Sequence, residues 1–202
     1  MRTSRLMLAF VMAVSVPFAT VPTPVVALGV PAQSGLSQGS PALVILVRHA
    51  EKAAGGSDPS LSESGQIRTK ALAAAIADAH VTAIITTTFK RTFETAEPFA
   101  MAHGITIEKI AVGGDSPAHV MAVAAAIRKH AGEVVLVVGH SNTVPAIVNA
   151  LGGPKLPDLC DASYATLFTL VPAKDGRSAQ VVRTKYGAPD PDGAETCTTP
   201  MR

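Results

Sequence analysis

Several residue types that characterise specialised proteins are scarce in this sequence. The 202 residues contain no Trp and only two Cys, and aromatic residues make up 4% of the chain. Two Cys cannot form the dense bridges of a disulfide scaffold. Charged residues make up 16%, and no run of Lys or Arg is interleaved with aromatic residues, as a nucleic-acid groove requires. The sequence therefore argues against a disulfide scaffold and against nucleic acid as a partner.

The apolar residues are numerous enough for one folded domain. They make up 48% of the chain, and the 17 basic and 15 acidic residues leave a formal charge of +2. A chain of this length and low charge can bury one hydrophobic core, and it does not have the composition of a disordered protein. We therefore expect a single globular domain.

The N-terminus has the layout of a secretory signal. Arg2 and Arg5 precede an apolar run, Leu6–Val16, which is followed by prolines and small residues. We expect a signal peptide over residues 1–32, cleaved near residues 27–32, and export to the periplasm or the exterior. The alternative is an uncleaved anchor, although the run is short for a membrane-spanning helix. After cleavage we expect no membrane contact.

The remaining chain divides into three parts by composition. Residues 33–41 are mostly Gly, Ser, Gln and Pro, which favours a flexible linker. Residues 42–187 carry the apolar periodicity of a domain, and residues 188–202 form a C-terminal tail rich in Pro, Asp and Gly. We find no internal repeat.

Aliphatic runs of strand length alternate with helical patterns along the domain. We expect buried strands at Ala42–Val47 and Val134–Val138, further strands at Val81–Thr86 and Ile105–Val112, and a hairpin of Ala165–Val171 with Ala179–Thr184. Helices are expected between them, with a capping box at Ser60 and Glu63 and an N-cap at Asn142. This order predicts an α/β domain of three layers, with a mostly parallel central sheet, helices on both faces and a late edge hairpin.

Basic and imidazole side chains follow three of these strands. Arg48 and His49 come directly after the first strand, and His140 comes directly after the strand at Val134–Val138. Arg91 stands where a helix begins after the second strand. Because the carboxyl ends of parallel strands meet at one edge of a sheet, we expect the four side chains to lie together.

Two arginines and two histidines suit a phosphoryl group. Guanidinium groups pair with phosphate oxygens, and a neutral imidazole can attack phosphorus while a protonated second imidazole stabilises the transition state. The two arginines would repel a metal cation from a site built of His49, Glu51 and His140, and no cofactor motif is present. Gly139-His140-Ser141 partly mimics a nucleophile elbow, but no histidine follows Ser141 to complete a hydrolase triad.

Four segments resemble the motifs of the histidine phosphatase superfamily, which comprises the phosphoglycerate-mutase-like proteins. The segments are Leu46-Val47-Arg48-His49-Ala50-Glu51-Lys52, Leu61-Ser62-Glu63-Ser64-Gly65, Lys90-Arg91-Thr92-Phe93-Glu94-Thr95-Ala96 and Val138-Gly139-His140-Ser141-Asn142. The resemblance implies that His49 is a nucleophile forming phosphohistidine, that Arg48 and Arg91 bind phosphate, and that His140 completes the pocket. The chain is too short for the helical cap of some branches, so the small uncapped branch is the better match.

The resemblance implies a metal-independent hydrolase of a small or envelope-linked phosphomonoester. Two alternatives stay open, a phosphoglycerate-mutase-like phosphotransferase and a non-catalytic module that binds phosphate ligands. Glu51, Ser141 and Asn142 are further candidate substrate-binding residues. The leaving alcohol needs a proton donor, for which Asp115 is preferred over Glu51 because it follows the third strand at the same edge. His119 is expected on a helix surface.

The two cysteines, Cys160 and Cys197, both lie in the part of the chain that export would deliver to an oxidising compartment. We therefore expect a disulfide between them. Two unpaired thiols are the alternative, since distant cysteines cannot be bridged.

Overall fold

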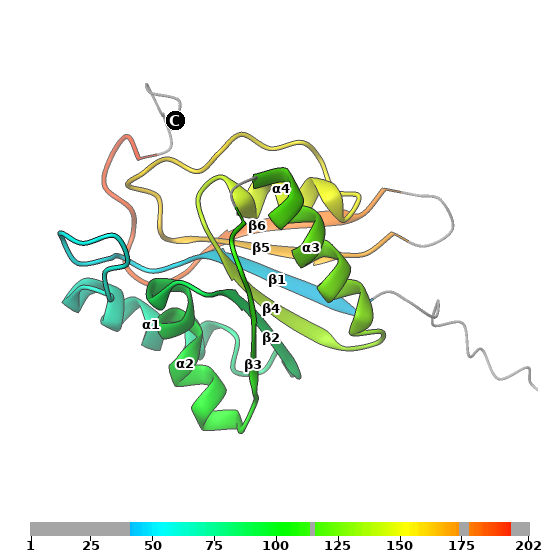
Figure 1. Cartoon of the computed structure of the whole chain (residues 1–202), viewed down its shortest axis with the longest axis horizontal. Helices are drawn as coiled ribbons and strands as arrows, with labels where there is room; N and C mark the ends of the chain where they lie inside the picture. Colours follow the sequence, from blue (N-terminus) through cyan, green and yellow to red (C-terminus); the bar gives the residue numbers. More distant parts are fainter. Residues whose placement is uncertain (1–40, 114–115, 174–177, 195–202) are drawn as a thin grey trace, which may run out of the picture. The chain divides into compact units, whose positions relative to one another are not determined.

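Strands and helices alternate along the chain until a final hairpin (Figure 1). The computed structural model describes residues 41–113, 116–173 and 178–194. The strands are β1 (Leu43–Arg48), β2 (Ala83–Thr87), β3 (Ile107–Ile110), β4 (Val134–Gly139), β5 (Thr166–Val171) and β6 (Gln180–Lys185). The helices are α1 (Glu63–Ala75), α2 (Lys90–His103), α3 (Ser116–Lys129) and α4 (Thr143–Ala150).

The six strands form one mixed sheet in the order β3-β2-β4-β1-β5-β6. The pairs β3–β2, β2–β4 and β4–β1 are parallel, whereas β5 is antiparallel to β1 and β6 is antiparallel to β5. This arrangement confirms the expected α/β fold with its late edge hairpin. The carboxyl ends of β2, β4 and β1 are neighbours, so the loops that follow them converge.

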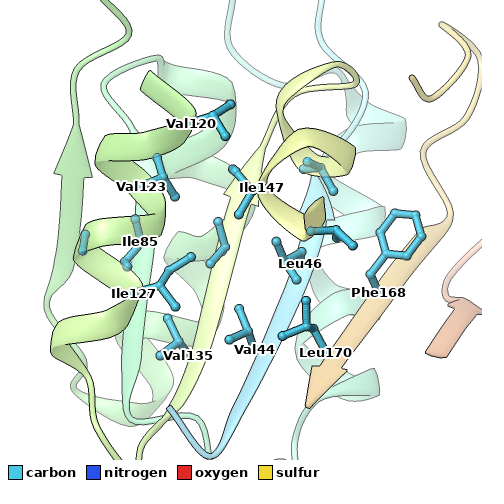
Figure 2. Packing of buried hydrophobic residues seen from close by; sticks show 14 of the residues in the cluster. Val44, Leu46, Ile85, Val120, Val123, Ile127, Val135, Ile147, Phe168 and Leu170 are labelled. Carbon is cyan, nitrogen blue, oxygen red and sulfur yellow. The ribbon is translucent and has the colours of Figure 1, made fainter. Parts of the chain in front are cut away.

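The central strands are buried on both faces, as their aliphatic sequences predict. Val44 and Leu46 of β1 belong to a cluster with α3 and α4, in which Ile127 and Ile147 are also buried (Figure 2). Ile45, one residue along, belongs to a second cluster with α1 and α2. Since successive strand residues point to opposite faces, the two clusters lie on the two sides of the sheet. Helices therefore cover both faces.

The start of α1 differs from the expected capping box. Ser62, not Ser60, is the N-cap, and its Oγ accepts the main-chain N–H of Gly65 at 3.2 Å. The reason lies in the preceding residue, because Leu61 forms an isolated antiparallel bridge with Lys52. That bridge keeps the chain extended up to Leu61, and the helix can begin only beyond it.

The strand expected from Ile105 begins later, at Ile107. The main-chain N–H of Ile105 donates to the carbonyl of Ala100 at 3.0 Å, and this bond completes the C-terminus of α2. Gly104 makes the turn possible by adopting a φ of 66°.

The predicted signal peptide and most of the predicted linker fall on residues 1–40, outside the described residues. In the described ranges, no helix is both long enough and apolar enough to cross a membrane.

Candidate active site

The fold brings the predicted residues to one edge of the sheet. His49 directly follows β1, His140 directly follows β4, and Arg91 lies in the first turn of α2, which begins shortly after β2. Arg48 is the last residue of β1 and pairs with Gly139 of β4. The ring centroids of His49 and His140 are 5.4 Å apart. The structure therefore places the two histidines side by side, with the two arginines supplied by the flanking elements.

His49 is held in one tautomer. Its side chain is 4% exposed, and Nδ1 lies 2.8 Å from the carbonyl oxygen of Ala50. Because a carbonyl only accepts hydrogen bonds, Nδ1 must carry the proton and Nε2 must carry the lone pair. Burial lowers the pKa of His49 to about 3, and the charge of Arg48 contributes in the same direction. At neutral pH the imidazole is neutral, as a nucleophile must be.

His140 is positioned from two sides. Its main-chain N–H donates to Thr143 Oγ1 at 3.0 Å, and its Nε2 lies 3.3 Å from Thr87 Oγ1. Burial lowers its pKa to about 3, with a further contribution from Arg91. The second imidazole, expected to be protonated, is therefore neutral in this structure. A phosphate dianion beside it would favour its charged form.

Arg48 is buried and tightly held. Its Nη1 donates to the main-chain carbonyls of Cys160 at 2.8 Å and Asp161 at 2.9 Å, and to that of Ser163 at 3.2 Å. The guanidinium carbon lies 4.1 Å from the centre of the Tyr164 ring. The Nε atom of Arg48 is buried and has no hydrogen-bond partner among the described residues. One donor of this guanidinium thus remains for another acceptor.

Arg91 is held by an acid that the sequence analysis missed. Its Nη1 lies 3.6 Å from Asp58 Oδ1, and its guanidinium stacks on the ring of Phe89 at 4.2 Å. Asp58 also accepts the main-chain N–H of Lys90 at 3.0 Å, at the start of α2. The Nε of Arg91, like that of Arg48, is buried without a partner in the described part of the chain. Burial lowers the pKa of Arg91.

Three threonines, one at the end of β2 and two in α2, link these groups, and the sequence analysis did not single them out. Thr87 Oγ1 lies 2.7 Å from Thr92 Oγ1, so the contact to His140 is part of a small hydroxyl network. Thr95 Oγ1 accepts the N–H of Ala50 at 2.9 Å, which ties α2 to the segment after His49. Thr92 and Thr95 stand in the motif around Arg91, which was the available signal.

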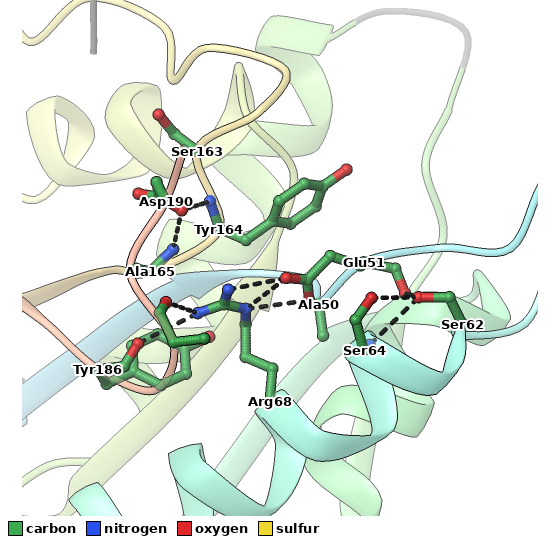
Figure 3. Close-up of polar contacts among 12 residues, drawn as sticks. Ala50, Glu51, Ser62, Ser64, Arg68, Ser163, Tyr164, Ala165, Tyr186 and Asp190 are labelled. Atoms are coloured by element: carbon green, nitrogen blue, oxygen red, sulfur yellow. Dashed lines mark hydrogen bonds and ion pairs between the residues drawn. The ribbon is translucent and has the colours of Figure 1, made fainter. Parts of the chain in front are cut away.

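The Glu51 carboxylate is engaged by another residue. Both of its oxygens lie 2.9 Å from Arg68 Nε, and one lies 2.7 Å from Arg68 Nη2. Arg68 also donates to the carbonyls of Tyr186 and Ala188, each at 3.1 Å (Figure 3). This arrangement favours a positioning role for Glu51 over direct substrate contact.

The remaining candidates have varied positions. Ser141 is buried, and its carbonyl accepts the N–H of Leu159 at 3.0 Å. Asn142 is exposed and makes no side-chain cap bond to α4. Asn142 thus occupies the expected N-cap position without the expected side-chain bond, and Thr143 Oγ1 accepts the N–H of His140. Asp115 lies outside the described residues.

His119 is not on the surface, as the sequence pattern suggested. It is 3% exposed, and its Nδ1 lies 3.1 Å from the carbonyl oxygen of Ala111, the first residue after β3. It is close enough to His140 for its charge to lower the pKa of that residue further. A third histidine thus lies near His140.

No group of three or more His, Cys, Asp or Glu side chains in the described ranges is placed to hold a metal ion. Cys160 lies in the segment that holds Arg48, and Cys197 lies outside the described residues. The pairing of the two cysteines therefore stays a prediction.

Comparison with known proteins supports the reading of the motifs. Residues 44–111 match the family model of the histidine phosphatase superfamily (branch 1), and this range includes Arg48, His49 and Arg91. No curated protein sequence matches the chain significantly.

Similar solved structures share the fold. One is the protein histidine phosphatase SixA complexed with tungstate, at 14% identity and a TM-score of 0.55, covering 71% of this chain and 96% of that one. Another is a candidate phosphohistidine phosphatase SixA from Agrobacterium tumefaciens, at 22% identity and a TM-score of 0.52, covering 74% and 99%. A third is mycobacterial glucosyl-3-phosphoglycerate phosphatase with VO3, at 16% identity and a TM-score of 0.53, covering 73% and 100%. The family-model match over residues 44–111 and the shared fold together support the resemblance to the histidine phosphatase superfamily.

Proposed function

We propose that this protein hydrolyses phosphomonoesters through a phosphohistidine intermediate on His49. One observation carries the proposal: His49 is neutral, its Nδ1 proton is bound to the Ala50 carbonyl, and its ring lies beside that of His140, within reach of the charges of Arg48 and Arg91. An imidazole held in this way can attack phosphorus only through Nε2. Its neighbours carry the positive charge that a phosphoryl group needs.

In the first step, Nε2 of His49 attacks the phosphorus atom of the ester. The P–N bond forms, the bond between phosphorus and the ester oxygen breaks, and its electron pair leaves with that oxygen. In the second step, a water oxygen attacks phosphorus and the P–N bond breaks, which releases inorganic phosphate and frees Nε2. Arg48 and Arg91 stabilise the charge on the phosphoryl oxygens in both transition states.

The leaving oxygen needs a proton, and the attacking water must lose one. We propose that Asp115 exchanges both protons, first as acid and then as base. Glu51, the other candidate, is less suited because its carboxylate is bound to Arg68. Asp115 belongs to the connection between β3 and α3, and β3 runs parallel to β2 toward the same edge of the sheet.

The comparisons favour dephosphorylation and leave a choice of substrates. Similar folds carry names as different as protein histidine phosphatase, glucosyl-3-phosphoglycerate phosphatase and phosphoserine phosphatase. We propose a small or envelope-linked phosphoester as the substrate here, because residues 1–32 have the layout of an export signal. N-terminal sequencing of the protein recovered from the exported fraction tests that placement, and an intact Met1 there would contradict cleavage.

A substrate screen tests the activity. The purified protein is assayed without added metal against phosphosugars, nucleotides and phosphopeptides, in parallel with His49→Ala and His103→Gln. His103 is an exposed histidine whose Nδ1 lies near the carbonyl of Phe99, so it serves as the matched control. We expect hydrolysis of at least one class, lost in His49→Ala and kept in His103→Gln. Binding of phosphate without hydrolysis of any class would support the non-catalytic alternative.

A further inference from the structure

The orientation of Arg48 depends on a loop that is distant from it in the sequence. We call residues 160–165, which precede β5, the Arg48 loop. Three of its main-chain carbonyls accept hydrogen bonds from Arg48 Nη1. The centre of its Tyr164 ring lies 4.1 Å from the guanidinium carbon. The Tyr164 hydroxyl also lies 3.4 Å from Arg48 Nη2. A guanidinium held by carbonyls in this way points where the loop directs it.

The Arg48 loop is held in turn by Asp190, which lies beyond β6. One carboxylate oxygen, Oδ1, accepts the main-chain N–H groups of Tyr164 at 2.7 Å and Ala165 at 2.8 Å (Figure 3). The other oxygen, Oδ2, lies 3.0 Å from Lys185 Nζ. The Asp190 side chain is only 5% exposed, whereas Lys185 is 44% exposed. The buried carboxylate of Asp190 thus accepts two short hydrogen bonds from the main chain of the Arg48 loop.

The charge of Asp190 suits this role. Burial alone would raise its pKa, but the N–H groups of Tyr164 and Ala165 and the Lys185 ammonium outweigh burial, so its pKa is lowered. The carboxylate therefore stays ionised across the neutral range. An ionised carboxylate that accepts two main-chain N–H groups makes bonds stronger than those of a neutral acceptor.

We propose that Asp190 is a positioning residue for the active site, which fixes the Arg48 loop through Tyr164 and Ala165 and so orients Arg48 toward the phosphoryl group. The proposal rests on the phosphate-binding role proposed above for Arg48. It gives the described part of the C-terminal tail, to which the sequence analysis assigned no function, a role in catalysis. Asp190 itself does not touch substrate; it acts through two main-chain bonds and one stacked arginine.

Three variants separate positioning from general stability. Asp190→Ala removes both bonds to the Arg48 loop, and Asp190→Asn keeps an amide oxygen that can accept them. Lys185→Gln removes the ammonium at the other oxygen and leaves both main-chain bonds in place. We expect Asp190→Ala to lower kcat/KM by about tenfold or more and to weaken inhibition by orthovanadate, because misplacing a charged contact by a fraction of an ångström is costly. Asp190→Asn should recover most of the loss, and Lys185→Gln should behave like the wild type.

A spectroscopic readout makes the test independent of catalysis. The Nε–H resonance of Arg48, assigned by its loss in Arg48→Lys, reports the guanidinium that lies over the Tyr164 ring. We expect this resonance to shift in Asp190→Ala and to stay near its wild-type position in Asp190→Asn and Lys185→Gln. If the resonance moves but no variant, wild type included, hydrolyses phosphoesters, the proposed function fails while the positioning role stands. An unchanged Arg48 resonance in folded Asp190→Ala would overturn the proposal. If Asp190→Ala does not fold, the test uses Asp190→Gly at lower temperature. An unchanged Arg48 resonance and unchanged activity in that variant would overturn the proposal equally.

Discussion

At the scale of single residues, the site consists of neutral acceptors surrounded by fixed donors. His49 and His140 are both uncharged at neutral pH because burial and the nearby guanidinium groups oppose their protonation. Arg48 and Arg91 each keep a buried Nε without a partner among the described residues. A buried donor without an acceptor destabilises the protein, so a ligand oxygen that accepts a hydrogen bond from this donor gains binding free energy. The site is thus arranged for an anion with several oxygens.

Replacing Arg91 tests that arrangement. We expect Arg91→Ala to raise the activation free energy by about 3 kcal/mol, because the fixed positive charge beside the transferred phosphoryl group is lost. This corresponds to a decrease in kcat/KM of more than a hundredfold. Steady-state kinetics on the best substrate measures the effect. Arg128→Ala is the matched control, since Arg128 is exposed and donates to the carbonyl of Ala150 away from the site. Equal kinetics for the two variants would exclude Arg91 from phosphate binding.

At the scale of elements, the site depends on how α1 meets the segment after β1. Ser62, the N-cap of α1, donates its main-chain N–H to the carbonyl of Glu51 at 2.9 Å. A Cβ added to Gly65 would overlap that same carbonyl oxygen. Glycine is therefore required in the first turn of α1 because the chain two residues after His49 passes directly against it.

Gly65→Ala should consequently destabilise the protein and displace the segment after His49. We expect a loss of about 1–3 kcal/mol in the free energy of unfolding, the usual cost of overpacking a close contact. Chemical denaturation measures it. Gly113→Ala serves as the control, because a Cβ there meets no atom within 4 Å and the residue has no positive φ. A Gly65→Ala protein as stable as the wild type would show that the main chain can yield at no cost.

The elements also show what the sequence could predict. Aliphatic runs predicted the central strands, because strands buried on both faces need no polar alternation, and the strand-end rule brought Arg48, His49 and His140 together. Asp58, Tyr164 and Asp190 were missed. Tyr164 lies 116 positions from Arg48 along the chain, and Asp190 reaches the loop through main-chain N–H groups that carry no sequence signal. Contacts of this kind depend on tertiary packing, which local patterns do not encode.

At the scale of the whole molecule, the two active-site histidines couple stability to pH. Both pKa values fall from 6.5 to about 3 on folding, so the unfolded chain binds more protons between these limits. The free energy of unfolding should therefore decrease as the pH falls below 6.5, by up to about 1.4 kcal/mol per pH unit for each histidine. Urea titrations at pH 7, 6 and 5 measure the slope. The double variant His49→Gln, His140→Gln should lose most of it, and an unchanged slope would contradict the assignment.

The predicted disulfide also acts on the whole chain. A bond between Cys160 and Cys197 would close a loop of 38 residues and contribute about 4 kcal/mol in the chain-entropy model. It would also fasten the Arg48 loop, since the carbonyl of Cys160 accepts Arg48 Nη1. Mass spectrometry of the unreduced, exported protein should show a mass two hydrogens lower than after reduction. Two alkylatable thiols in that material would rule the bond out.

The central claim is that His49 carries the phosphoryl group during turnover. The direct measurement is rapid acid-free quenching of the enzyme with labelled substrate, followed by peptide mapping of the label. We predict an acid-labile, base-stable phosphoramidate on the peptide that contains His49, formed within one turnover and absent from His49→Ala. Label found on another residue, or substrate hydrolysed at a normal rate by His49→Ala, would contradict the account.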